Sequence, residues 1–172
     1  MAEDGGAQGA QARASVFQFA YRRSADQDAG RPVRRPVVVV GAGPVGLTLA
    51  VDLAQRGIPV VILDDADRIG EGSRAICFSK RTLEVWDRMG VGTRMVDKGV
   101  TWQIGKVFLE GDPVYQFDLL PEDGHRMPAF VNLQQYYAEH FLVERALELE
   151  AIDLRWLNKV VAVEPRDDGV LV

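Results

Sequence analysis

The first informative pattern is a block of apolar positions interrupted by glycines. Residues 37–40 are a continuous valine run, which is typical of a short strand buried on both faces of a parallel sheet. Apolar residues then recur at helical spacing, and Gly57 is placed to end that helix. The helical set is Leu49, Ala50, Leu53 and Ala54. Residues 59–63 predict a second buried strand that Asp64 closes, so the sequence predicts a right-handed βαβ unit.

The later part of the chain predicts two more helices and several strands. Ser79 can cap a helix over residues 80–89, and a second amphipathic helix is predicted over residues 132–151. Between them, residues 104–119 read as two strands around a Gly-Asp turn at 111–112, which is typical of a hairpin. The aligned helix positions are Leu83, Trp86 and Met89, then Ala138, Phe141, Leu142, Ala146 and Leu149. Further strands are predicted over residues 154–157, 159–165 and 169–172.

Residues 1–34 differ from the rest of the chain in composition. They are rich in Ala, Gly and Gln and show no sustained periodicity, so we interpret them as a mobile leader. Phe17, Phe19 and Tyr21 alternate and could dock as a short extended piece, but the mobile leader is the favoured interpretation.

Composition and charge exclude several classes of protein. The 172 residues suffice for one domain of ordinary size, and the net charge of -5 argues against nucleic acid as a partner. The single cysteine, Cys77, excludes an internal disulfide and a paired-cysteine redox or zinc motif. No apolar run approaches the ~20 residues that span a bilayer, and the N-terminus lacks an apolar signal core. We therefore expect a soluble cytoplasmic protein without a membrane partner.

The turn after the first strand has the pattern Gly-x-Gly-x-x-Gly. It consists of Gly41, Ala42, Gly43, Pro44, Val45 and Gly46. In a dinucleotide-binding unit, Gly41 allows the tight turn, Gly43 lets the backbone approach a pyrophosphate, and Gly46 lets the helix lie close to the sheet. The pyrophosphate would bind the free amides and the positive dipole end at the helix N-terminus. Pro44 is tolerated because first-turn amides have no partner within the helix.

Asp64 completes this fingerprint at the end of the second strand. Its carboxylate would accept hydrogen bonds from a ribose hydroxyl and would repel the 2′-phosphate of NADP. Asp65 and Asp67 extend the acidic cluster, but ribose and solvent explain these carboxylates better than a metal ion does, so no metal site is expected. A tight turn without a ligand is the less favoured alternative.

Three separated stretches then add a family resemblance. They are residues 37–65 (VVVVGAGPVGLTLAVDLAQRGIPVVILDD), 72–91 (GSRAICFSKRTLEVWDRMGV) and 131–146 (VNLQQYYAEHFLVERA). In this order they resemble the N-terminal part of the FAD-dependent aromatic hydroxylases, the single-component flavoprotein monooxygenases of the phenol and hydroxyphenylpropionate hydroxylase type. The resemblance implies an α/β, Rossmann-like FAD-binding βαβ domain with the start of a β-rich substrate-binding layer. It assigns residues 35–172 to the N-terminal, truncated part of that domain, with residues 101–131 beginning the substrate-binding sheet.

The resemblance also implies a set of cofactor-binding residues. Those matching the family's adenosine-diphosphate site are Gly41, Gly43, Gly46 and Asp64. Arg74 matches an arginine near the pyrophosphate and flavin side of FAD, where a guanidinium can bind phosphate oxygens with two donors. Gln135 matches a glutamine that reaches the ribityl chain in relatives, and Gln134 is the alternative. Asp65 departs from the family, which often has a basic residue there, so its adenosine-side contact is open.

The family's reaction implies the function. NAD(P)H reduces FAD, and the reduced flavin with O2 hydroxylates a phenolic ring. We therefore expect the chain to be the FAD-binding N-terminal segment of an oxidoreductase that acts on a small aromatic substrate. Two further family motifs, an Asp-Gly and a Gly-Asp segment, have no counterpart in the chain, so we expect it to be incomplete and inactive alone. No residue is assigned as catalytic, and the substrate, the choice between NADH and NADPH, and the oligomeric state stay open.

Two other functions are compatible with the sequence. The glycine fingerprint alone fits a NAD-dependent dehydrogenase, and the absent downstream motifs fit a non-enzymatic nucleotide-binding module. The remaining reactive residues add no site: His125 is expected at the surface and His140 at a solvated helix position. Cys77 is expected to be a buried thiol, because Ile76 and Phe78 flank it.

Overall fold

The computed structural model describes residues 18–70 and 74–172. The described chain divides into two compact units. The first contains residues 18–70 and 142–172, and the second contains residues 74–141. Of the predicted mobile leader, residues 1–34, residues 1–17 fall outside the described residues, and so does the possible docking of Phe17. Residues 18–34 contain a short helix, Ala25–Asp28, and Phe19, whose ring stacks on Trp156, so for Phe19 the structure shows the docked alternative.

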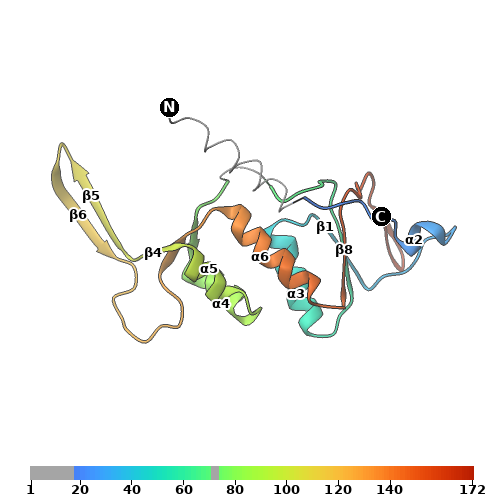
Figure 1. The fold of residues 1–172 in the computed structure, drawn as a ribbon, viewed down its shortest axis with the longest axis horizontal. Coiled ribbons are helices and arrows are strands. Elements are labelled where there is room, and N and C mark those ends of the chain that lie inside the picture. Colours follow the sequence, from blue (N-terminus) through green and yellow to red (C-terminus); the bar gives the residue numbers. More distant parts are fainter. Residues whose placement is uncertain (1–17, 71–73) are drawn as a thin grey trace, which may run out of the picture. The chain divides into compact units, whose positions relative to one another are not determined.

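A three-stranded parallel sheet forms the centre of the first unit (Figure 1). Its strands, in spatial order, are β1 (Val37–Val40), β2 (Val60–Leu63) and β8 (Ile152–Arg155). Both predicted strands are present and pair in parallel, and β2 is buried as predicted. The predicted burial of the valine run on both faces was wrong, because β1 is an edge strand in which Val39 is buried and Val40 is exposed. Val39 pairs with Ile62, and Ile62 pairs with Leu154, so these three residues lie on one face of the sheet.

The predicted crossover helix is α3 (Pro44–Gln55), which packs on that face. Its buried residues are Leu47, Ala50, Val51 and Ala54. The buried stripe is therefore rotated from the predicted one, since Leu49 is exposed and Leu47 is fully buried. The helix ends as predicted, because Gly57 takes a left-handed backbone with φ 76° after its last turn.

Three shorter elements complete the first unit. They are α2 (Ala25–Asp28), β9 (Glu164–Arg166) and β10 (Gly169–Leu171). The last two form the predicted terminal antiparallel pair. The strand predicted over residues 159–165 was wrong for residues 159–163, which form no strand. The strand predicted over residues 154–157 begins earlier, as β8, because Ile152 and Leu154 pair with β2.

An antiparallel sheet and two helices make up most of the second unit. The strands, in spatial order, are β3 (Cys77–Ser79), β7 (Phe130–Asn132) and β4 (Val100–Trp102), and the helices are α4 (Lys80–Arg88) and α5 (Gly92–Lys98). Ser79 is the N-cap residue of α4, as predicted, although its side chain makes no capping hydrogen bond. Leu83, Trp86 and Met89 are buried, so the predicted apolar face is confirmed.

Helix α5 was not predicted, because it is short and mostly polar. Its position depends on close packing at Gly92, where a Cβ would lie 2.6 Å from the Cα of Asp87. Met95 is its fully buried anchor. A helix this short and this polar shows too little hydrophobic periodicity to be predicted from the sequence.

The predicted hairpin consists of β5 (Ile104–Leu109) and β6 (Asp112–Asp118) (Figure 1). Gly111 has φ 97° in the turn, as a tight hairpin requires. The two strands form a sheet of their own, separate from β4 and β7. Phe108, Leu109 and Tyr115 are exposed. The assignment of residues 101–131 to a substrate-binding sheet stays a prediction.

The second predicted helix is α6 (Gln135–Leu147), which is shorter than its predicted range. Ala138, Leu142 and Ala146 are fully buried, which confirms the predicted apolar stripe. Within the described part of the chain, no helix has the length and apolar character needed to cross a membrane.

Cys77 does not lie where the sequence places it. Its side chain is exposed, so the expectation of a buried thiol was wrong. Cys77 starts the edge strand β3, and its neighbour Ile76 is half exposed, so the flanking apolar residues do not enclose it.

We therefore predict that a thiol reagent labels Cys77 in the native protein at a rate within about tenfold of the rate in denaturant, because an exposed thiol reacts without unfolding. The release of chromophore from an aromatic disulfide reagent measures both rates. A native rate slower by about a thousandfold would show that the thiol is buried after all.

Candidate functional site

The glycine turn connects β1 to α3 at the carboxyl end of the sheet. Gly41 has φ 103°, a left-handed conformation that favours glycine, and its amide donates to the carbonyl of Leu63 at 2.8 Å. This hydrogen bond joins the turn to the end of β2. This is the place where parallel sheets bind their ligands, because strand ends and helix N-termini meet there.

Helix α3 begins directly after this turn. Gly43 is its N-cap residue, with an extended backbone, and Pro44 takes the first helical position. The first intrahelical bond runs from the amide of Leu47 to the carbonyl of Gly43 at 3.0 Å. The amides of Val45 and Gly46 therefore have no acceptor within the helix, and they lie at its positive dipole end. This is an arrangement that binds an anionic phosphate.

Two glycines of the turn have opposite environments. A Cβ on Gly43 would meet no atom within 4 Å, so the space beside this backbone is open. A Cβ on Gly46 would overlap the carbonyl oxygen of Gly41 and would lie 3.1 Å from a methyl group of Val39. Gly46 is thus required by the packing of the fold, whereas Gly43 leaves room for a ligand. A pyrophosphate against the backbone needs this combination.

Asp64 lies against the turn. One carboxylate oxygen, Oδ2, accepts the amide of Ala42 at 2.6 Å, and Oδ1 accepts the amide of Ala66 at 2.9 Å. The Asp64 side chain is half-buried. Each oxygen of an ionised carboxylate has two acceptor positions, so the group can still accept a ribose hydroxyl.

The backbone of Asp64 is held from the neighbouring strand. Its amide donates to the carbonyl of Arg155 at 3.1 Å, and its carbonyl accepts the amide of Asn158 at 2.8 Å. The structure thus brings together the turn and the carboxylate that the fingerprint predicts. Asp65, the next residue, is exposed.

The remaining predicted cofactor residues belong to the second unit. Arg74 is exposed in the loop before β3. Gln135 is the first residue of α6 and is half-buried, whereas the alternative, Gln134, is exposed just before the helix. The Nε2 of Gln135 donates to Oε1 of Glu139 at 2.6 Å, so the amide group of Gln135 has a defined partner one helical turn further on.

Glu139 was missed as a functional candidate. It is a buried carboxylate, 5% exposed, on a helix whose other buried residues are apolar. The signal was present in the sequence, because a glutamine and a glutamate four residues apart lie on the same face of a helix. Among the described residues, no group of three or more His, Cys, Asp or Glu residues could hold a metal ion. His125 is exposed, as predicted, and His140 is half-buried rather than solvated.

Comparison with known proteins identifies the family. The sequence pattern of the FAD binding domain family matches residues 34–172. The chain is 34% identical to 6-methylpretetramide 4-monooxygenase of Streptomyces rimosus over 138 residues, which are 78% of this chain and 24% of that protein. It is 31% identical to a probable NADH-specific resorcinol 4-hydroxylase of Rhodococcus jostii, over 79% of this chain and 26% of that protein.

The fold is also similar to that of solved relatives. The crystal structure of p-nitrophenol 4-monooxygenase from Pseudomonas putida superimposes with a TM-score of 0.72 at 29% identity, over 79% of this chain and 35% of that one. The chain thus spans about a quarter to a third of the length of these relatives. The glycine turn, the helix N-terminus and the Asp64 carboxylate lie inside the matched region. The chain belongs to the FAD-binding domain family.

Proposed function

We propose that this domain holds the adenosine-diphosphate half of FAD on the glycine turn. The amides of Val45 and Gly46 would bind the pyrophosphate, and the open space at Gly43 would admit it. The carboxylate of Asp64 would accept a ribose hydroxyl while it keeps the amide of Ala42. The observation that carries this proposal is the contrast between Gly43 and Gly46, because a turn needed only for packing has no reason to leave Gly43 open.

We propose further that Arg74 and Gln135 act on the other side of the cofactor. A guanidinium binds phosphate oxygens with two parallel donors, which suits Arg74 to the pyrophosphate. Gln135 already gives an amide hydrogen to Glu139, so its carbonyl oxygen is the atom that can accept a ribityl hydroxyl. Asp65 would contact the adenosine side from its exposed position.

The activity that we propose belongs to the protein that carries this domain. It is a NAD(P)H-dependent hydroxylation of a phenolic or other aromatic compound with O2, in which bound FAD supplies the redox chemistry. The names of the matched relatives support an aromatic substrate, and that of the Rhodococcus relative supports a nicotinamide reductant. In this proposal residues 35–172 are the FAD-binding domain, residues 101–131 begin the substrate-binding sheet, and the protein is cytoplasmic.

The residues of this chain would bind and orient rather than transfer protons. The turn, Asp64, Arg74 and Gln135 hold the cofactor, and their donors and acceptors match its phosphates and hydroxyls. No described side chain is assigned as an acid or a base. The exposed apolar hairpin β5–β6 is the surface that we assign to the substrate side.

The proposed function is tested by NAD(P)H consumption in the presence of FAD and O2. With the protein that carries this domain, we expect consumption of NADH or NADPH that a phenol stimulates, with a hydroxylated product detected by mass spectrometry. Reduction of a keto acid or oxidation of an alcohol without bound flavin would instead indicate a NAD-dependent dehydrogenase.

Arg74→Ala should weaken FAD binding by about tenfold, the effect of losing one hydrogen-bonded charge contact. Quenching of flavin fluorescence on titration with the protein measures this dissociation constant. Arg81→Ala is the matched control, because Arg81 is an exposed arginine of the same unit that pairs only loosely with Glu84, at 3.6 Å. Equal affinities for the Arg74 and Arg81 variants would remove Arg74 from the site.

A further inference from the structure

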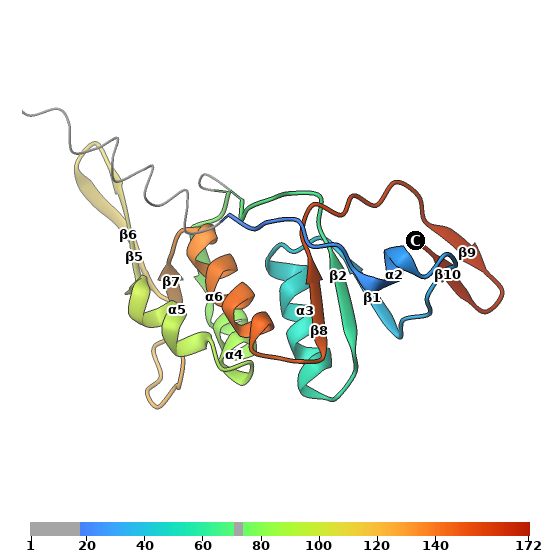
Figure 2. The same ribbon diagram turned by 45° about the vertical axis from the view of Figure 1, so that its right-hand side comes forward.

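The segment Gln18–Asp28 lies before the region that matches the family, which begins at residue 34. We call this segment the N-terminal strap. It belongs to the first unit and includes the short helix α2. Figure 2 shows α2 and α3 on opposite sides of the parallel sheet. The strap therefore covers a part of the sheet that the crossover helix does not reach.

The first anchor of the strap is at Gln18 and Phe19. The ring of Phe19 stacks on Trp156, with centroids 4.5 Å apart and planes inclined by 5°. The amide of Phe19 donates to the carbonyl of Asp67 at 2.6 Å, and Nε2 of Gln18 donates to the Asp67 carboxylate at 2.9 Å. Trp156 is itself buried, so this contact is a packed one.

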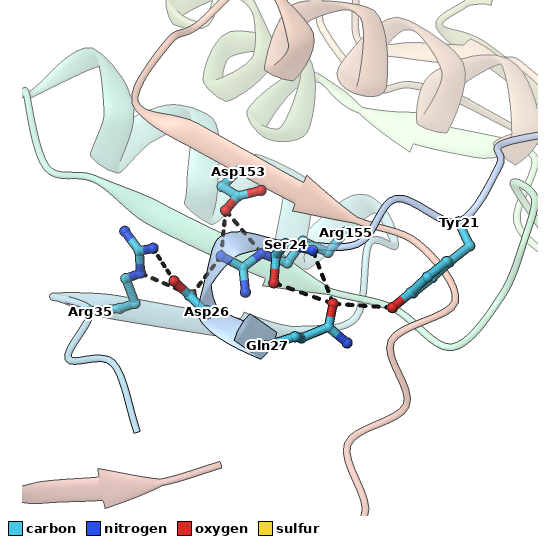
Figure 3. Close-up of polar contacts among 7 residues, drawn as sticks. All are labelled: Tyr21, Ser24, Asp26, Gln27, Arg35, Asp153 and Arg155. Carbon is cyan, nitrogen blue, oxygen red and sulfur yellow. Dashed lines mark hydrogen bonds and ion pairs between the residues drawn. The ribbon is translucent and has the colours of Figure 1, made fainter. Parts of the chain in front are cut away.

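The second anchor is Asp26, on α2 (Figure 3). Its carboxylate accepts hydrogen bonds from the guanidinium groups of Arg35 and Arg155, the latter at 2.7 Å. Arg155 is also bonded to Asp153, at 2.9 Å through its Nε. The side chains of Asp26 and Arg155 are 18% and 10% exposed, so this ion pair is far less screened by water than a surface pair.

The strap is preorganised for this contact. Ser24 and Gln27 form a capping box at the start of α2, and the amide of Ser24 donates to Oε1 of Gln27 at 2.9 Å. The hydroxyl of Tyr21 donates to the same oxygen at 3.1 Å (Figure 3). These local bonds fix the turn from which Asp26 projects toward Arg155.

Both anchors act on the segment that contains Asp64. The carbonyl of Arg155 accepts the amide of Asp64, and the residues after Trp156 continue this contact. The amide of Leu157 donates to Ala66 at 3.1 Å, and the amide of Asn158 donates to Asp64. Asp67 is held directly by the strap. The loop from Asp64 to Asp67 therefore lies between strand β8 and the strap, which hold it from both sides.

We propose that the N-terminal strap positions Asp64 for the ribose of FAD. The strap acts through Asp67 and through the backbone of Arg155 and Trp156, and it touches no cofactor itself. The proposal rests on the proposed function, in which Asp64 accepts a ribose hydroxyl. In this proposal, a segment that lies outside the residues matching the family helps to set the affinity of the domain for its cofactor.

Substitution at each anchor tests this role in the full chain. We expect Phe19→Ala and Asp26→Asn each to weaken the binding of FAD and of ADP by about tenfold, measured by calorimetric titration at a temperature where circular dichroism shows the fold intact. Asp28→Asn is the matched control, because Asp28 lies on the same helix and pairs with Arg23 where both side chains are about 60% exposed. Its dissociation constants should stay within about twofold of those of the wild type.

A ligand-free measurement separates positioning from a loss of stability. Hydrogen exchange at the amides of Ala42 and Ala66, which donate to Asp64, should become about tenfold faster in the strap variants. Exchange in α4, a helix of the other unit, should not change. If exchange accelerates equally everywhere, or if Ala42 and Ala66 are unaffected, the strap does not position Asp64.

Strap substitutions made in the Asp64→Asn variant show whether the loss of FAD affinity depends on Asp64. The strap substitutions should add nothing further in that background, because the group that they position is gone. An undiminished tenfold loss there would overturn the inference. If the wild-type chain binds neither FAD nor ADP, the proposed function itself fails. If the wild-type chain binds both, but the strap variants bind FAD and ADP as tightly as the wild type does, the strap inference alone fails.

The acidity of Asp26 adds a pH test of the same anchor. The hydrogen bonds from Arg35 and then from Arg155 lower the pKa of Asp26 from 3.8 to about 2, with Asp153 as the other carboxylate facing Arg155. A carboxyl whose pKa is lowered in the folded state adds stability above its unfolded pKa, and this is lost as the pH falls toward the folded value. The gap in melting temperature between wild type and Asp26→Asn should therefore be constant above pH 5 and should close between about pH 4 and pH 2. A gap that persists at pH 2 would contradict the ion pair.

Discussion

Replacing Gly46 with alanine is expected to destabilise the first unit by about 3 kcal/mol and to abolish FAD binding. The added methyl group would overlap the carbonyl oxygen of Gly41, which is backbone and cannot rotate away as a side chain could. Either α3 must move off the sheet or the turn must open, and each change separates Asp64 from the amides that we propose bind the phosphates. Urea unfolding followed by circular dichroism measures the loss of stability, and flavin fluorescence measures the binding.

Gly43→Ala is the matched control for this prediction. The backbone of Gly43 has φ −78° and ψ −178°, which alanine adopts freely, and a Cβ there meets no atom within 4 Å. The free energy of unfolding should change by less than about 0.5 kcal/mol. FAD affinity should nevertheless fall by at least about tenfold, because the methyl group would occupy the space that we propose for the pyrophosphate. If both variants unfold alike, or if Gly43→Ala binds FAD normally, the assignment of the two glycines is wrong.

Asp64→Asn is expected to weaken FAD binding by about a hundredfold. The carboxylate accepts two backbone amides and, in the proposed complex, a ribose hydroxyl. Hydrogen bonds to a charged acceptor are each stronger than neutral ones, and an amide in place of the carboxylate points a donor at one of those backbone donors. Calorimetric titration with FAD measures the loss.

The control for this substitution is Asp52→Asn. Asp52 is a partly exposed aspartate of α3 in the same unit, and it pairs with Arg56 at 3.2 Å in an i,i+4 contact worth a few tenths of a kcal/mol. Its FAD affinity should equal that of wild type. An Asp64→Asn variant that binds FAD as tightly as Asp52→Asn would mean that the ribose is held elsewhere.

The βαβ unit was predictable from sequence because its signals are local. A continuous valine run is typical of a strand in a parallel sheet, and the glycine turn and Asp64 follow from the fingerprint spacing. Helix α5 and the strands β3 and β7 were not predicted. Each is short, and the two strands also depend on a partner far away in the chain, through pairings such as that of Phe78 with Val131. Tertiary pairing of this kind leaves no periodic signal in a three-residue strand.

In the candidate site, too, the local features were predictable from the sequence and most of the contacts between distant residues were not. That Asp64 ends the second strand and belongs to the same fingerprint as the glycine turn was predicted, but the hydrogen bond that joins them, from the amide of Ala42, was not, because a backbone donor has no residue type to recognise. The link from Gln135 to buried Glu139 had a signal in its i,i+4 spacing that was overlooked. The docking of Phe19 had a signal in the alternation of Phe17, Phe19 and Tyr21, but its partner Trp156 had none, and neither did the ion pair of Asp26 with Arg155, since these contacts join residues more than a hundred positions apart.

A competition titration tests most directly whether the glycine turn and Asp64 hold the adenosine-diphosphate half of FAD. The chain is titrated with FAD, and the bound flavin is then challenged with ADP or with FMN. We predict that one FAD binds per chain, that ADP displaces it, and that FMN, which lacks the adenosine half, does not. FMN that competes as well as ADP, or a chain that binds no FAD at all, would contradict this site.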